Sequence, residues 1–297
     1  MKIVEPLEFL TTKELADILR VKERKIYEMA AANEVPFTRV TGKLLFPKAL
    51  VISWLSRRTE LGEDGLALPD PPVVALGSHD PLLDWALRES GSGMASFFDG
   101  SLDGFDRFAR REGVLCGMHV PAPEAEGWNR HLIEARMPAM PVVLMEWAWR
   151  ERGLIVPAGN PRKIAGIADL AGCRTVPRQP EAGTQLLFDR LAAAAGLAPD
   201  AYERLRPARS EQDVALAVLE GQADAGLGLA SVAAQYRLGF VPLVRERFDL
   251  AVWRRSWFSA PVQAFLSFCR TPDFADRAAQ LGGYDVSGFG RVHYNGP

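Results

Sequence analysis

Three small hydroxyl residues, Ser78, Ser101 and Thr184, each stand where a strand-like apolar run gives way to a helical pattern. At such a turn the hydroxyl group and the free N–H groups of the first helical turn can together bind an anion. These hydrogen bonds are strong when the acceptor is ionised. Because Ser and Thr are also common N-caps, capping is the alternative role of each residue. Their repetition favours a binding site for a small anion.

Other polar residues stand close to these turns. His79 follows Ser78, His119 ends a third strand-like run, and Arg178 comes shortly before Thr184. Arg178 could hold either a ligand anion or a carboxylate of its own domain. His79 could hydrogen-bond a ligand or simply line the rim of the binding site. His119 could bind the ligand or could be a histidine whose hydrogen bonds are satisfied at the end of a strand. The predicted ligand-binding residues are Ser78, His79, Ser101, His119, Arg178, Gly183 and Thr184.

The residues do not predict catalysis. Ser78, His79 and Asp80 are adjacent, so their side chains diverge, whereas a nucleophile, its base and the group that orients the base converge from distant segments. Asp80 or Ser78 instead suits the cap of the following helix. Cys116 and His119, three residues apart on a strand, point to opposite faces. Without a Gly-x-Ser-x-Gly turn, a phosphate loop or metal-ligand spacing, we expect no enzyme, no metal site and no cofactor.

Composition indicates an ordinary globular protein. The 297 residues can form two or three units. The opening MKIVEPLEFLTTKEL lacks the pattern of a signal peptide, and no apolar run reaches the ~18 residues of a membrane span. Three scattered cysteines indicate a reducing compartment, so we expect a cytoplasmic protein without membrane contact. Residues 1–58 carry 11 Lys and Arg against 7 Asp and Glu, although the whole chain has net charge −2. A basic head suits a polyanionic partner.

The pattern of the first 58 residues is helix, turn, helix, hairpin, helix. Residues 10–21 and 22–34 read as helices, 35–47 as two short strands around Thr41-Gly42-Lys43, and 48–58 as a third helix. In helix-turn-helix proteins of this order, the second helix enters the major groove of DNA by its N-terminal residues. The head therefore suits double-stranded DNA as a partner.

The head resembles the excisionase/MerR-like winged helix-turn-helix family. The matching stretch is LTTKELADILRVKERKIYEMAAANEVPFTRVTGKLLFPKALVISWL, with its Thr-x-x-Glu-Leu-Ala opening and its Gly-Lys wing. The alternative for its charged residues is a solvated basic face. A homodimer or a higher homo-oligomer is expected, because two-fold symmetry sets the spacing of half-sites on DNA. The predicted DNA-binding residues are Lys22, Arg24, Lys25, Tyr27, Arg39 and Lys43.

After a Gly/Pro/Asp-rich linker over 59–71, strand and helix patterns alternate to the end of the chain. Alternation predicts an α/β domain over 72–297 with mostly parallel sheets. We expect one lobe over 72–155 and 241–297 and a second over 156–240, with the ligand between them beyond the carboxyl ends of the strands. Residues 141–159 read as a pair of strands, and FVPLV and FDLAVW read as two more.

From about residue 73 to 281 this body resembles the periplasmic-binding-protein-like domains found behind DNA-binding heads in bacterial regulators and near molybdenum-cofactor genes. The matching stretches include GSHDPLLD, FDGSLDGF, CGMHV, RQPEAGTQLLFDRL and GQADAGLGLASVA. In transport relatives of this fold, hydroxyl groups and backbone N–H groups hold molybdate or tungstate. The resemblance therefore implies molybdate or tungstate as the ligand.

The fold class expected is α/β, with a winged helix-turn-helix followed by a two-lobed periplasmic-binding-protein-like domain. The function expected is a ligand-responsive transcription regulator that binds operator DNA and senses molybdate or tungstate. One alternative is a regulator that senses an organic metabolite or cofactor precursor, for which Arg178 would matter more. Another is an enzyme or carrier of molybdenum-cofactor metabolism with a tethering head.

Overall fold

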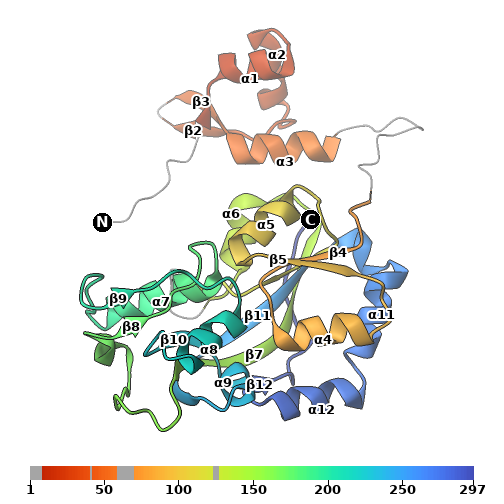
Figure 1. The fold of residues 1–297 in the computed structure, drawn as a ribbon. Coiled ribbons are helices and arrows are strands. Elements are labelled where there is room, and N and C mark those ends of the chain that lie inside the picture. Colours follow the sequence, from red (N-terminus) through yellow and green to blue (C-terminus); the bar gives the residue numbers. More distant parts are fainter. Residues whose placement is uncertain (1–8, 41, 59–69, 123–126) are drawn as a thin grey trace. The chain divides into compact units, whose positions relative to one another are not determined.

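The computed structural model covers residues 1–297 and describes residues 9–40, 42–58, 70–122 and 127–297 (Figure 1). The chain divides into two compact units, Met1–Pro69 and Asp70–Pro297. Most of the predicted linker, residues 59–69, and Thr41 of the predicted hairpin lie outside the described residues. In the described part of the chain, no helix is long and apolar enough to cross a membrane.

The first unit has the predicted order of helix, helix, hairpin and helix, preceded by a short strand that the sequence did not indicate. An antiparallel sheet in the order β1-β3-β2 packs with the helices around a core that includes Leu15, Ile26 and Phe46. The elements are β1 (Phe9–Leu10), α1 (Thr12–Leu19), α2 (Glu23–Ala31), β2 (Thr38–Val40), β3 (Lys43–Pro47) and α3 (Lys48–Arg58).

Helix α1 begins at Thr12 because Thr11 forms a capping box with Glu14. Glu14 N donates to Thr11 Oγ1, and Thr11 N donates to Glu14 Oε2 at 2.7 Å. The helix ends at Arg20, which adopts a left-handed conformation with φ of 53°. This sharp end leaves only three residues, Arg20 to Lys22, before α2 begins at Glu23, the tight turn that a helix-turn-helix needs.

The second unit is an α/β domain built on one eight-stranded sheet (Figure 1). The sheet order is β10-β7-β11-β6-β4-β5, and β12 and β13 also pair with β7. The strands are β4 (Val74–Gly77), β5 (Ala95–Phe98), β6 (Leu115–Met118), β7 (Val142–Val156), β8 (Arg174–Thr175), β9 (Glu203–Arg204), β10 (Gly226–Leu229), β11 (Gly239–Trp253), β12 (Tyr284–Asp285) and β13 (Val292–Asn295). The helices are α4 (Pro81–Glu89), α5 (Ser101–Ala109), α6 (Arg130–Arg136), η1 (Ile167–Leu170), α7 (Gly183–Ala194), α8 (Glu211–Leu219), α9 (Ala230–Gln235), α10 (Arg254–Trp257), α11 (Ala260–Phe268) and α12 (Pro272–Leu281).

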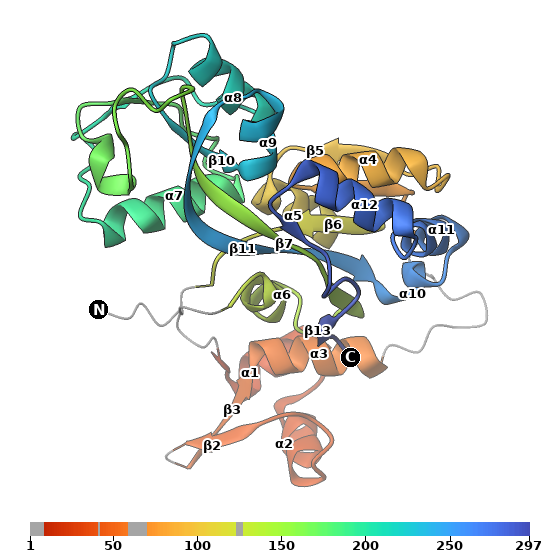
Figure 2. The same cartoon turned by 90° about the horizontal axis from the view of Figure 1, so that it is seen from below.

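Two long antiparallel strands, β7 and β11, run through the whole unit side by side (Figure 2). The prediction that each of these segments is a pair of strands was wrong. Pro242 interrupts the apolar run of β11, but a register shift between Pro242 and Val244 absorbs it, as β-bulges do. Gly153 lets β7 approach its partner at the same level, where a Cβ atom would lie 2.1 Å from Val241 O.

The sheet is mixed, and most of its strand pairs are antiparallel, so the prediction of mostly parallel sheets was wrong. Strand β4 is parallel to β5 and to β6, as the alternation with helices predicts. By contrast, β6, β11, β7 and β10 are each antiparallel to the next. Each of these antiparallel pairs includes β7 or β11, the two long strands that carry the chain from one half of the unit to the other.

The long strands join two lobes with separate cores. In one lobe Phe248 and Leu250 pack toward α4, α11 and α12, while Ala251 packs toward α5 and α6 on the other face of the sheet. In the other lobe Leu154 packs with η1 and α7, while Ile155 packs with α8 and α9. This alternation follows from the two-residue period of a strand. The change of lobe therefore falls inside β7 and β11, near residues 150 and 246.

Glycines bring the first helices close to the sheet. A Cβ atom at Gly104 in α5 would lie 2.1 Å from Gly77 Cα at the end of β4. Gly77 itself has φ of +107° and lies against the backbone of Gly117 in β6. The close packing sets the start of α5 beside the carboxyl ends of β4 and β6, where the polar residues of the first lobe gather.

Loss of the Thr11 hydroxyl tests the start of the helix-turn-helix. We expect Thr11→Ala to lower the free energy of unfolding of the first unit by about 1 kcal/mol, because Glu14 N loses its acceptor. Thr11→Ser keeps the hydroxyl group and is the matched control. Circular dichroism during urea titration measures both variants. Equal stability of the alanine and serine variants would contradict the role of this cap.

Candidate functional site

A chain of hydrogen bonds links Ser78, His119 and Glu246, which lie at the ends of β4 and β6 and within β11. Ser78 Oγ lies 3.0 Å from His119 Nε2, and His119 Nδ1 lies 3.0 Å from Glu246 Oε2. Ser78 directly follows β4, His119 directly follows β6, and Glu246 lies in the middle of β11. All three side chains are buried. The strand ends of one lobe and the middle of a long strand thus meet at the imidazole ring.

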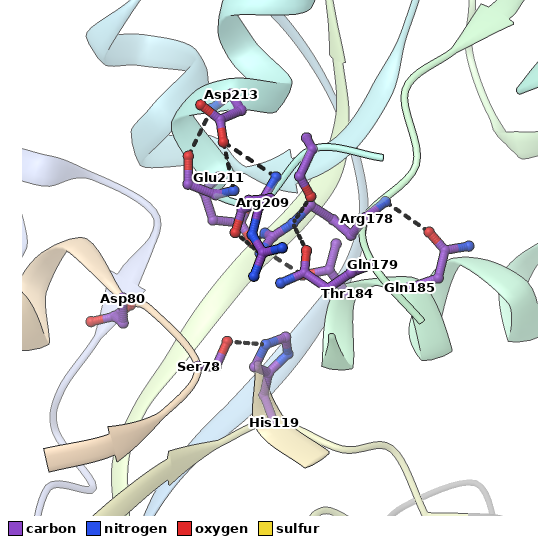
Figure 3. A network of polar contacts seen from close by, with 12 residues as sticks. Ser78, Asp80, His119, Arg178, Gln179, Thr184, Gln185, Arg209, Glu211 and Asp213 are labelled. Atoms are coloured by element: carbon purple, nitrogen blue, oxygen red, sulfur yellow. Dashed lines mark hydrogen bonds and ion pairs between the residues drawn. The ribbon is translucent and has the colours of Figure 1, made fainter. Parts of the chain in front are cut away.

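Glu246 belongs to a buried ion network on the two long strands. Its Oε1 accepts hydrogen bonds from Arg150 and from Arg152, which also donates to Glu211 at 2.8 Å. Arg150 also donates to Asp80, at 2.8 Å. Arg178 joins the network through Glu211, at 3.0 Å. The three guanidinium groups named here therefore balance three carboxylates, and Figure 3 shows part of this arrangement.

The charges in this network are fixed by their neighbours. Burial alone would raise the pKa of Glu246, but the positive charges of Arg150 and Arg152 outweigh it and hold that pKa well below its ordinary value. The pKa of Glu211 falls to about 2 for the same reason, with burial opposed by Arg152 and Arg178. Burial lowers the pKa of His119 despite the nearby Glu246 carboxylate. Burial thus favours the neutral form of the imidazole beside the ionised Glu246 carboxylate.

The first turns of α5 and α7 meet at this site from opposite lobes. Neither helix has a side-chain cap, because Gly100 and Ala182 hold the N-cap positions. A Cβ atom at Gly183 would lie 2.8 Å from His119 O. Leu102 N donates across the lobes to Glu181 O at 3.1 Å. Two helix N-termini with their partial positive charge thus face one another across His119.

The structure brings six of the seven predicted ligand-binding residues into this region. His119 N donates to Ser101 Oγ at 3.3 Å, in addition to the contacts of its ring with Ser78 and near Gly183. Thr184 Oγ1 donates to Glu211 Oε1 at 3.0 Å, beside Arg178. In Figure 3, Ser78 and His119 lie on one side, and Thr184, Arg178 and Glu211 on the other.

His79 points elsewhere. It lines a separate cavity of about 470 Å³ with residues of α4, α8, α9 and α12, including Trp85, Ser231 and Arg277. Its ring packs edge-to-face on Phe98 with centroids 5.9 Å apart. Its neighbour Asp80 caps α4, because Leu83 N donates to Asp80 Oδ1 at 2.7 Å. Of the two capping residues that the sequence offered for this helix, Asp80 is the one used.

Arg178 takes the second of its two predicted roles and binds a carboxylate within its own lobe. Besides the contact with Glu211, its Nε donates to Ala208 O at 3.1 Å and its Nη2 donates to Arg209 O at 3.0 Å. The side chain is buried. Each nitrogen of this guanidinium therefore already has a partner within the protein.

Sequence reasoning missed the ion network. Arg150, Arg152, Glu211 and Glu246 were not among the predicted site residues. Their signal was present, since Arg150 and Arg152 stand at alternate positions of an apolar strand and so share one face. Charged side chains inside an apolar strand are paired when they are buried. The partners could not be inferred, because Glu211 and Glu246 lie far from both arginines in the sequence.

In the first unit, the predicted DNA-binding residues are all exposed. Tyr27 of α2 and Arg39 and Lys43 of the hairpin line one hollow of about 580 Å³. Arg24 and Lys25 lie on the exposed side of α2 and pair with Glu28, at 3.1 and 3.9 Å. Lys22 is the N-cap residue of this helix. The second helix and the hairpin thus present a hydroxyl group and basic side chains to one concave surface.

Removal of one partner tests the buried network. We expect Arg152→Met to lower the free energy of unfolding of the second unit by about 3–5 kcal/mol, because Glu211 and Glu246 keep buried charge with less compensation. The control is Arg204→Ala, which removes an exposed pair with Asp189 at 4.0 Å and should cost under about 1 kcal/mol. Urea titration followed by tryptophan fluorescence measures both. Similar decreases in stability for the two variants would contradict a central role for the network.

The pKa shifts also predict how stability depends on pH. As the pH falls below 6.5, the unfolded chain gains a proton on His119 that the folded protein does not take up, so stability decreases. Below 4.5 stability decreases further, because Glu211 and Glu246 stay ionised only in the folded state. His119→Gln should flatten the first decrease and leave the second. A variant that keeps the wild-type slope between pH 5 and 6.5 in urea titrations would contradict a neutral buried His119.

Comparisons with known proteins agree with this division of the chain. Residues 9–59 match the model of a helix-turn-helix domain. The chain is 22% identical over 299 residues to the uncharacterized protein YvgK of Bacillus subtilis, covering 95% of this chain and 96% of the relative. The sulfate-binding protein SubI of Mycobacterium tuberculosis is similar in fold, with a TM-score of 0.52 and 16% identity over 72% of this chain and 85% of that one. The regulatory domain of Synechocystis CcmR, in complex with 2-PG, aligns at a TM-score of 0.47 and 12% identity over 66% of this chain and 93% of that one.

The two-lobed α/β fold expected from the sequence is confirmed, and so is a helix-turn-helix domain before it. The pair of domains supports a ligand-sensing, DNA-binding regulator rather than an enzyme. The model of the PBP superfamily domain matches residues 84–270, which is more than half of the chain. The chain therefore belongs to the PBP superfamily.

Proposed function

We propose that this chain is a one-component transcription regulator that binds operator DNA through its first unit and a small oxyanion between the lobes of its second. The observation that carries the proposal is the meeting of α5 and α7, two helix N-termini without side-chain caps, at the buried His119. Helix N-termini favour anions through their free N–H groups and their dipole. The first unit acts as a winged helix-turn-helix of the excisionase/MerR type, as a homodimer in the cytoplasm.

Neutral donors would hold the anion. Arg150, Arg152 and Arg178 are already paired with carboxylates, so none of them offers an uncompensated positive charge. Ser101 Oγ accepts from His119 N, which leaves its O–H free to donate. Arg178 would matter more for an organic carboxylate, and each of its guanidinium nitrogens already has a partner within the protein. Molybdate and tungstate, implied by the family resemblance, are the first anions to test, with sulfate and phosphate beside them.

Binding would favour the closed arrangement of the lobes. Contacts between the lobes include Arg209 Nη2 to Asp99 Oδ1 at 2.6 Å and Leu102 N to Glu181 O at 3.1 Å. A ligand held by both α5 and α7 adds its own contacts to this arrangement alone. It therefore shifts the equilibrium between open and closed lobes by its difference in affinity for the two. In a dimer, the shift would change the spacing of the two DNA-binding units and hence the affinity for operator DNA.

Thermal melting of the full chain with each anion tests the ligand class. An anion at a hundredfold excess over its dissociation constant should stabilise the protein by about 2.7 kcal/mol, which raises the melting temperature. Ser101→Ala should weaken that effect, because it removes a free hydroxyl donor. Ser259→Ala, which changes a hydroxyl at the start of α11, is the control. The absence of any shift with molybdate, tungstate, sulfate and phosphate would reject an oxyanion as the ligand.

Salt dependence of DNA binding tests the first unit. The slope of log K against log salt concentration becomes less steep by about 0.9 for each DNA phosphate that the protein no longer neutralises. We therefore expect Arg39→Ala and Lys43→Ala each to weaken binding of a mixed-sequence duplex and to reduce this slope. Lys163→Ala, an exposed lysine of the second unit, is the control. Fluorescence anisotropy across a salt series measures the slopes. Unchanged slopes would show that the hairpin does not contact DNA phosphates.

A further inference from the structure

The cavity that His79 lines, here called the His79 cavity, is a different place from the candidate anion site. Its walls come from α4 and α12 of the first lobe and from α8 and α9 of the second, and its volume is about 470 Å³. The chain of Ser78, His119 and Glu246 and the ion network contribute none of the described residues that line it. The cavity therefore has a function of its own to be explained.

Three helices each turn a polar face toward this cavity. Gly283, with φ of +69°, ends the turn after α12 so close to α9 that a Cβ atom there would lie 2.9 Å from Ala230 Cβ. Residues three or four positions apart share one face of a helix. The pairs that line the cavity in this way are Trp85 and Arg88 on α4, Ser231 and Gln235 on α9, and Arg277 and Gln280 on α12.

Arg277 brings an unpaired positive charge to the cavity. Its Nε is buried without a hydrogen-bond partner, and no carboxylate pairs with its guanidinium group, among the described residues. The group lies over the ring of Trp85, 5.7 Å from the centroid, which holds it in place. The other two charges on the wall offset each other, because Arg88 pairs with Asp84 at 2.9 Å. The wall thus has one uncompensated positive charge, which favours a ligand with one negative charge.

The rest of the wall is polar but uncharged. His79 Nδ1 is buried and has no hydrogen-bond partner among the described residues. The amide groups of Gln212, Gln235 and Gln280 and the hydroxyl group of Ser231 also line the cavity. Each of these groups can both donate and accept hydrogen bonds, as the hydroxyl groups of a ligand can. Beyond its charged end, a matching ligand therefore carries hydroxyl groups rather than an alkyl chain.

We infer that the His79 cavity binds a small organic acid with one carboxylate and several hydroxyl groups, as in a sugar acid. The carboxylate pairs with Arg277, whose planar guanidinium group matches it with two parallel hydrogen bonds. The hydroxyl groups pair with His79 and the glutamine amides. The volume falls within the range of about 300–1,000 Å³ that is usual for sites of small organic ligands. This ligand is additional to the proposed oxyanion and needs none of its binding residues.

Titration calorimetry of the full chain, in a buffer free of oxyanions, tests the inference with gluconate, glucuronate, galacturonate and quinate. Glucose, which lacks the carboxylate, and hexanoate, which lacks the hydroxyl groups, are the matched probes. We expect at least one hydroxylated acid to bind more tightly than both. Arg277→Gln should weaken that acid by about 10- to 100-fold, because a charged hydrogen-bonding partner is lost. Gln280→Ala should weaken it by about 3- to 10-fold.

Arg270→Gln is the control for Arg277→Gln. Arg270 also lies over an aromatic ring, that of Phe289 at 6.0 Å, but it does not line the cavity, so its loss should leave the affinity unchanged. Melting temperatures without ligand check that each variant is folded, and Gln280→Ala keeps the test valid if Arg277→Gln is unstable.

Three results would overturn the inference. Binding that survives Arg277→Gln, or Gln280→Ala if the arginine variant is unstable, would place the acid elsewhere. Hexanoate or glucose binding as tightly as the hydroxylated acids would reject the ligand class. Failure of all four acids to bind would reject the site. Because the titrations contain no oxyanion, each of these results leaves the proposed oxyanion site standing, and a failure of that site leaves this one standing.

Discussion

The Glu246 carboxylate is the interaction on which the second unit depends. It lies in the middle of β11, where the chain changes from one lobe to the other, and it is buried. One oxygen accepts from Arg150 and Arg152 of the neighbouring long strand, and the other orients His119. A buried charge of this kind is tolerable only when it is fully paired, so the strands, the lobes and the site must assemble in one register. The same carboxylate therefore pairs with the arginines of the long strand and orients a residue of the candidate site.

This arrangement couples the two lobes through charge as well as through the backbone. Arg152 bridges Glu246 and Glu211, and Glu211 also holds Thr184 in the first turn of α7. A change at the first turn of α7 therefore reaches the long strands through a few short hydrogen bonds. The lobes can share a ligand because residues on both sides of it belong to one balanced network.

Much of the fold was predictable, but the network was not. The order of helices and hairpin in the first unit follows from local signals, such as the Thr11 cap and the glycine at position 42. The turns that carry Ser78, Ser101 and Thr184 were also visible as strand-to-helix changes. The single strands β7 and β11 were misread, because Gly153 and Pro242 mimic chain breaks that pairing across the sheet overrides. Partners such as Arg152 and Glu246, 94 residues apart, are set by that pairing and leave no local pattern.

The central claim is that an anion between the lobes controls the binding of DNA. The direct measurement is the dissociation constant of the full chain for a duplex selected from a random-sequence pool, with and without saturating molybdate, tungstate, sulfate or phosphate at fixed ionic strength. Allosteric coupling of ordinary size predicts a change of about 5- to 150-fold in either direction. An unchanged dissociation constant, with calorimetry showing that the anion is bound, would contradict the claim.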